Sequence, residues 1–202
     1  MALLAPRVLA DEENEISFHV GRASLIGTTA ASGSVYGVRY LHSRTEQIEV
    51  GVDFDFMRLQ SKDKDADTYL ASTSIDSASI LGVVRIGPTE GTLRPNCLMG
   101  LGVHFTSVKF QGEPKTNFVW RDTGTAEKRT LVDSGAKGAA IKIQVGADYA
   151  LTDNVLIGAF LGGNYLGSAK YEATDQSKSL GVDSLSGNML VIAMGVNFAA
   201  RF

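Results

Sequence analysis

The feature that most constrains this sequence is a strict alternation of side-chain types at its C-terminal end. The residues between the apolar ones are smaller and more polar, among them Gly195, Asn197 and Arg201. A helix would bring its apolar residues back every three or four positions, so the pattern predicts a β-strand of about 13 residues with one apolar face. The apolar residues are Leu190, Ile192, Met194, Val196, Phe198, Ala200 and Phe202.

The same alternation recurs along the chain and is sharp in residues 48–57, where Val52 and Phe54 alternate with Asp53 and Asp55. Near Gly21 the apolar phase shifts, as a β-bulge would produce. The pattern predicts an all-β protein with eight strands. The predicted strands cover 16–25, 36–41, 48–57, 80–86, 97–109, 139–150, 155–165 and 190–202.

The connections between these strands also alternate, in length. They cover residues 28–33, 43–46, 60–75, 87–96, 111–137, 151–154 and 168–187. Apart from the first, every odd-numbered connection is long and polar, whereas the even-numbered ones are tighter. In an antiparallel barrel the long connections would all emerge at one end, as the external loops of outer-membrane barrels do.

The hydropathy of the chain is compatible with a membrane protein built from strands. Its apolar runs are far shorter than the roughly 18 residues that a transmembrane helix requires. The mean hydropathy of +0.04 also fits transmembrane strands, because their two faces average out. The 22 glycines argue against a mainly helical protein.

The kind of residue on each face distinguishes a membrane barrel from a soluble one. The apolar face carries bulky residues such as Phe54, Phe105 and Ile143, whereas the other face is rich in glycine, alanine, asparagine and a few charges. An eight-stranded barrel is just wide enough inside for side chains to fill it, so the bulky face is expected to point outward. We therefore predict an eight-stranded antiparallel up-and-down transmembrane β-barrel, and keep a soluble ligand-binding barrel as the alternative. The tyrosines and the phenylalanine expected in interfacial girdles are Tyr36, Tyr40, Tyr149, Tyr165 and Phe202.

The polar face supplies charges that would lie inside such a barrel. Buried charges must pair, so we expect a salt-bridge network that fills the lumen; a gate or a proton path is the functional alternative. The predicted network comprises Arg39, Glu49, Asp53, Asp55, Arg85, Lys142, Asp148 and Arg201.

Two features suggest contacts outside the lumen. The longest connection contains Phe118, Trp120 and Arg121, which are expected to anchor the loop at the rim or the lipid interface, or to contact a partner. Small residues interrupt the outward rows and could seat a second barrel in a homo-oligomer. They are Gly37, Gly82, Ala159 and Gly163.

Residues that could support other chemistry are sparse. His19, His42 and His104 lack a serine and an acidic residue at same-face spacing, so no catalytic residue is predicted. With Cys97 as the single cysteine, neither a disulfide, a metal site nor a cofactor is expected. A net charge of −3 with scattered lysines and arginines gives no basis for nucleic-acid binding.

The N-terminal residues 1–13 are interpreted as an extension that precedes the barrel of residues 14–202. The sequence Val8-Leu9-Ala10 before Asp11 resembles a signal-peptidase site. The extension is therefore either the end of a signal peptide or a plain extension.

Two segments resemble a known family. The segment from Val191 to the terminal Phe202 resembles the targeting signal that the barrel-assembly machinery recognises, with Val196 and Phe198 as further signal residues. Residues 146–154 are similar to a strand–turn–strand junction of OmpA-like outer-membrane barrels. The resemblance implies the outer membrane of a Gram-negative bacterium, outer-membrane lipids and the assembly machinery as partners. The resemblance covers the barrel only, and we do not expect the peptidoglycan-binding domain of many OmpA proteins.

These observations predict a non-enzymatic outer-membrane barrel with a filled lumen and a structural or interaction role through its external loops and its lipid-facing surface. A narrow pore or a conduit for hydrophobic ligands is the alternative within the membrane.

Overall fold

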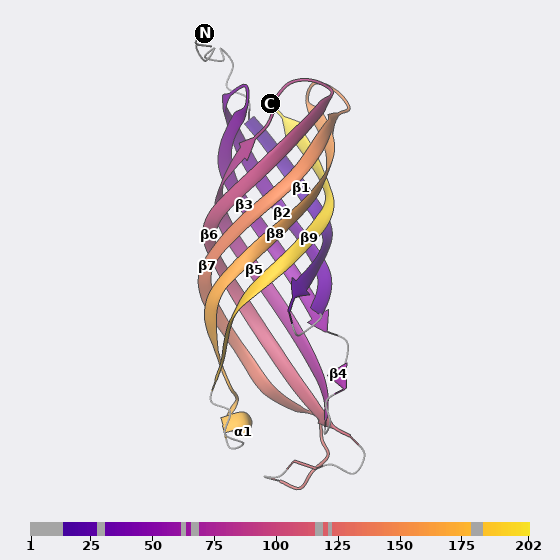
Figure 1. Cartoon of the computed structure of the whole chain (residues 1–202), viewed down its shortest axis with the longest axis vertical. Coiled ribbons are helices and arrows are strands. Elements are labelled where there is room, and N and C mark those ends of the chain that lie inside the picture. The colour runs from indigo at the N-terminus through magenta and orange to yellow at the C-terminus, as the bar shows by residue number, and fades with distance from the viewer. Residues whose placement is uncertain are drawn as a thin grey trace.

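The computed structural model describes residues 14–27, 31–61, 64–65, 69–115, 119–120, 123–178 and 184–202. The predicted N-terminal extension lies outside these residues. Almost all of the described chain is β-structure that wraps around one long axis (Figure 1). The strands and the one short helix are β1 Asn14–Ile26, β2 Ala31–Thr45, β3 Ile48–Ser61, β4 Lys64–Asp65, β5 Tyr69–Ile86, β6 Leu93–Pro114, β7 Arg129–Ala150, β8 Val155–Glu172, α1 Asp175–Lys178 and β9 Ser184–Arg201.

The long strands form a closed antiparallel barrel. Each pairs with the next one along the chain, β3 pairs with β5, and β1 pairs with β9 to close the sheet. The two-residue β4 pairs only with the start of β5 and adds nothing to the closed wall. The predicted eight-stranded up-and-down barrel is therefore confirmed.

The two ends of the barrel differ, as the lengths of the connections predicted. The start of β1 pairs with the C-terminus, where the backbone N–H of Asn14 donates to the carbonyl of Phe202 at 2.9 Å. The short connections 46–47, 87–92 and 151–154 lie at this end, which we call the terminal end (Figure 1). The other four connections, with β4 and α1, lie at the opposite end, which we call the loop end.

Several strands extend further toward the loop end than predicted. β5 begins at Tyr69 instead of residue 80, and β7 begins at Arg129 instead of residue 139. The connection between β6 and β7 is correspondingly shorter than the predicted 111–137. In these extensions the outward residues are polar, for example Asp76 and Asp133, so the apolar alternation that marks the strands is lost.

The predicted bulge near Gly21 is wrong. β1 pairs without a register shift with both β2 and β9 up to this region and beyond it. Ala23 and Leu25 simply face the lumen, Ala23 being 1% exposed. The apolar residues change faces because the inner surface becomes apolar toward the loop end. Register shifts occur instead between Ser43 and Thr45, Phe110 and Gln111, and Leu166 and Ala169.

The outer face carries the bulky apolar side chains, as predicted. Phe54 is 39% exposed and Ile143 is 56% exposed, although both are apolar. A contiguous exposed apolar surface of this kind is stable only against lipid, which disfavours the soluble barrel. The five predicted girdle residues, Tyr36, Tyr40, Tyr149, Tyr165 and Phe202, are all among the exposed side chains. Among the described residues no helix is long and apolar enough to span a membrane, a result that has no bearing on strands.

The lumen is less uniformly polar than the sequence suggested. Leu41, Leu98 and Leu156 are fully buried on the inner face between or beside the charges. Toward the loop end the inner residues are mostly apolar, and they pack into one cluster that includes Val35, Leu59, Ile75, Val108, Val132 and Val191. The interior is thus polar at the terminal end and in the middle, and apolar at the loop end.

Candidate functional site

The candidate site is the polar part of the lumen, where charged side chains from non-adjacent strands meet. They point inward because they occupy one alternating set of positions, while their neighbours along each strand point into lipid. They form two groups. We call Glu15, Glu49, Arg85, Asp148 and Arg201 the terminal cluster, and His19, Arg39, Asp53, Asp55 and Lys142 the central cluster.

Arg85 is the centre of the terminal cluster. Its guanidinium donates to both carboxylate oxygens of Glu15, at 2.8 and 2.6 Å, and through Nε to Glu49. Arg201 bonds the same two carboxylates from the opposite wall, at 3.1 Å to each. The two glutamates therefore share two arginines, and all four side chains are buried.

Asp148 completes the terminal cluster with less charge compensation. It lies 3.5 Å from Arg85 Nη1, a long contact for an ion pair. Its oxygens instead accept hydrogen bonds of 2.7 Å from the side-chain amides of Asn96 and Asn197. These amides satisfy a buried carboxylate that would otherwise carry a large desolvation cost.

The central cluster is built around Lys142. Its ammonium donates to Asp53 at 2.8 Å and to Asp55 at 2.7 Å, and both aspartates are completely buried. Arg39 donates to Asp53 at 3.0 Å, and His19 Nε2 lies 2.6 Å from Asp55. Two carboxylates thus meet one lysine and one arginine, with the imidazole as a further partner.

Space for the His19 ring depends on a glycine. Gly37 lies opposite His19 on β2 and faces the lumen. An added Cβ there would lie 2.5 Å from His19 Nε2. Gly37 was predicted to interrupt the outward rows, and that prediction is wrong.

Metal binding is the first chemistry that this geometry suggests. His19, Asp53 and Asp55 each offer one ligand atom, and these atoms lie within 4.8 Å of one another. The Lys142 ammonium, however, already donates to both carboxylates and supplies the positive charge that an ion would bring. The arrangement is therefore better suited to ion pairing than to metal coordination.

The structure places all eight residues of the predicted lumen network inside the barrel and in contact with an opposite charge. Sequence reasoning missed Glu15 and His19 as members. Both lie on β1 at positions that alternate with Ile16 and Phe18, so the period of two could have found them. The suspected bulge obscured that period.

The other histidines form hydrogen bonds that do not resemble a catalytic group. His104 Nδ1 lies 2.8 Å from Thr106 Oγ1, and its Nε2 lies 3.2 Å from the carbonyl of Gly167. His42 Nδ1 lies 3.2 Å from Asn14 Oδ1. Neither histidine has a carboxylate partner among the described ion pairs. That the chain is not an enzyme stays a prediction.

Of the predicted loop contact residues, Phe118 and Arg121 lie outside the described part of the chain. Trp120 folds back onto its own loop: its indole N–H donates to the carbonyl of Glu127 at 2.7 Å. The Arg129 guanidinium lies 5.2 Å from the centre of the indole ring. These contacts favour a structural role for Trp120, and a partner for the loop stays a prediction.

The remaining outward features are spread around the barrel. Gly82 lies on β5, whereas Ala159 and Gly163 lie on β8, three strands away. The three small residues therefore form no single patch for a second barrel. The predicted assembly signal residues Val196, Phe198 and Phe202 point outward and are exposed.

Comparison with known proteins identifies the fold. The sequence matches no family model and no curated protein. The structure is similar to the outer membrane protein OprG of Pseudomonas aeruginosa, with 14% identity, a TM-score of 0.51, and coverage of 93% of this chain and 96% of OprG. It is also similar to the attachment invasion locus protein Ail of Yersinia pestis (13% identity, TM-score 0.48, 95% and 99% covered) and to Neisserial surface protein A (16%, 0.45, 95% and 96%).

At these identities the likeness concerns the fold alone. The chain has the fold of the eight-stranded outer-membrane barrels, which confirms at that level the resemblance to OmpA-like barrels. The predicted location in a Gram-negative outer membrane agrees with that of these structures. The fold does not fix the role, because one fold carries many functions.

Replacing Arg85 by methionine should test the terminal cluster. The change leaves the Glu15 and Glu49 carboxylates buried without their main partner, which is expected to lower the free energy of unfolding by about 3–5 kcal/mol. Urea unfolding of protein refolded into lipid vesicles would measure it. Lys109→Met, which breaks the exposed pair with Asp133, is the matched control and should cost less than about 1 kcal/mol. Equal decreases in the free energy of unfolding in both variants would contradict the stabilising role of the terminal cluster.

Proposed function

We propose that this protein is a closed outer-membrane barrel that acts as a structural and interaction protein and does not conduct solutes. The observation that carries this proposal is the set of ion pairs that cross the lumen. Arg85 on β5 bonds Glu15 on β1, and Lys142 on β7 bonds Asp53 on β3, so the bonded strands are not neighbours in the wall.

Each ion pair that crosses the lumen makes the lumen costly to open. A solute or an ion would have to separate paired charges that are buried in the lumen, and breaking such a pair is costly. The fully buried Leu41, Leu98 and Leu156 fill further inward positions between or beside these charges. Water-filled channels belong to larger barrels, whereas the interior of an eight-stranded barrel is wide enough only for its own side chains or one small ligand.

An interaction role is supported by the difference between the two ends. The terminal end has only short connections, while the loop end carries four, the longest of them between β6 and β7. In an outer-membrane barrel the longer loops face the outside and the short turns face the periplasm. We therefore infer that the loop end is the surface offered to external partners.

Recording from purified protein in planar bilayers tests the closed lumen. We expect no steady open state at either sign of the voltage, because the ion pairs of both clusters lie in series across the lumen. Addition of a general porin to the same bilayer should then produce channels, which shows that the bilayer supports insertion. A sustained conductance that scales with the amount of the protein would contradict the proposal.

A second candidate function, the binding of an apolar ligand, is favoured by a cavity at the loop end of the lumen. Its volume is about 440 Å³, within the range of small-molecule sites. Inward residues Leu25, Ile75, Val108 and Met189 line it. Its mouth lies where β1 ends and β9 begins, at residues 26–27 and 186–188.

Methyl NMR of the barrel in lipid nanodiscs, titrated with octanol, tests this candidate. The Ile75 and Val108 methyl signals should shift at lower octanol concentration than the signal of Val103, which faces lipid on the same strand as Val108. Val108→Trp should fill the cavity and abolish the shift at Ile75, whereas Val103→Trp should not. A uniform response of all methyl groups would mean simple partition into lipid and would exclude a site.

A further inference from the structure

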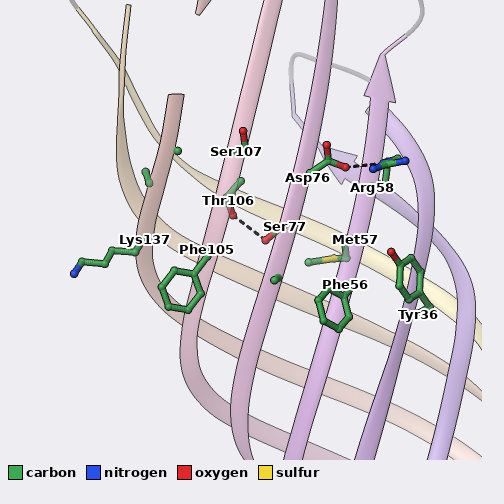
Figure 2. Close-up of a pocket in the computed structure, with 13 residues that line it drawn as sticks. Tyr36, Phe56, Met57, Arg58, Asp76, Ser77, Phe105, Thr106, Ser107 and Lys137 are labelled. Carbon is green, nitrogen blue, oxygen red and sulfur yellow. Dashed lines mark hydrogen bonds and ion pairs between the residues drawn. The ribbon is translucent and has the colours of Figure 1, made fainter. Parts of the chain in front are cut away.

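The outer wall of the barrel has a hollow that the lumen does not explain. Its volume is about 780 Å³, and it lies across β2, β3, β5, β6 and β7 (Figure 2). Ala78 forms its floor: along the register of the sheet this residue lies between Phe56 and Phe105. A small side chain between two aromatic ones leaves a trough in an otherwise bulky row.

The walls of the hollow are aromatic. Phe56 stacks on Tyr36 with ring centres 5.7 Å apart and planes 16° from parallel. Phe105 stands on the other side of the trough and is 52% exposed (Figure 2). These rings belong to the outward apolar surface, so this part of the hollow suits a hydrocarbon chain.

One row closer to the loop end the lining becomes polar. Arg58, Asp76 and Ser107 lie side by side in this row, and Arg58 Nε bonds Asp76 Oδ1 at 2.7 Å. Lys137 lines the hollow from β7, beside Phe105 at the level of the aromatic row and on the side away from Arg58 (Figure 2). In the described part of the chain no carboxylate forms an ion pair with Lys137. Arg58, Lys137 and Asp76 are the charged residues that line the hollow, so the lining as a whole carries a net charge of +1.

We propose that the hollow binds one phosphorylated membrane lipid. Its acyl chain lies over Ala78 between Phe56 and Phe105, and its phosphate is bound by Lys137 and Arg58. The aromatic row and the polar row that holds Arg58 stand in the order that an amphiphile has, and Lys137 flanks the hollow on β7. Basic groups at a membrane surface bind anionic headgroups. A second barrel presents a convex wall, which fits a concave hollow poorly. The inference rests on the proposed membrane orientation, in which the loop end faces the outer leaflet.

Native mass spectrometry of the purified barrel in detergent, with added lipid A or phosphatidylcholine, tests the site. The wild-type protein should retain one lipid A per barrel and much less phosphatidylcholine. Ala78→Trp should abolish retention by filling the trough, although both cations remain. The double variant Arg58→Ala, Lys137→Ala should weaken retention by about 30-fold, because two headgroup contacts are lost.

The controls come from β8, whose outward face carries the same residue types away from the hollow. Ala159→Trp and Lys170→Ala should retain lipid A as the wild type does. The inference is overturned if Ala78→Trp retains lipid A as the wild type does, or if both control variants lose as much lipid A as Ala78→Trp. It is also overturned if the wild-type protein retains phosphatidylcholine as well as lipid A. A dimer mass that Ala78→Trp removes, with lipid binding unchanged, would mean that a second copy is the occupant. A conducting barrel that still binds lipid A would overturn only the closed lumen.

Discussion

The ion pairs that cross the lumen are the interactions on which the rest of this structure depends. Side chains alternate along a strand, so each strand that sends a charge inward must send its neighbours outward. Arg85, Lys142 and their carboxylate partners thereby fix the polar face of the wall to the inside. The bulky apolar residues can then only face outward, and such a surface requires lipid. One set of buried contacts thus couples register, face polarity and the membrane.

Much of this architecture could be predicted from the sequence because a period of two is a local signal. The alternation in the C-terminal strand, with Ile192 and Phe198 outward, and around Phe54 was sufficient to predict the class, and its recurrence in eight segments predicted the number of strands. Prediction failed toward the loop end, where the inner face of the barrel becomes apolar and the outer face becomes polar. At Ala23 an apolar residue faces the lumen, and near Lys109 a polar residue faces outward. The sequence pattern alone cannot distinguish these changes from a bulge or a loop.

The members of the polar network were predictable, but their partners were not. That Asp53 and Lys142 point inward follows from alternation, whereas their contact follows from the closure of the barrel across 89 residues of chain. The amides that bond Asp148 come from β6, next to β7, and from β9, two strands away, so these contacts follow from the pairing of strands in the wall. The cavity at the loop end and the hollow over Ala78 depend on side-chain volumes in three or more strands. No single segment reveals them.

The central claim is that the bulky side chains face lipid around an ion-paired interior. The most direct measurement is the accessibility of spin labels placed singly at Phe54 and Ile143, with a label at the inward Val83 as the comparison, in reconstituted vesicles. Collisions with oxygen, which concentrates in lipid, should be frequent at Phe54 and Ile143 and rare at Val83. Labels at Phe54 and Ile143 that instead meet water-soluble relaxants, or are shielded from oxygen as the label at Val83 is, would contradict the account.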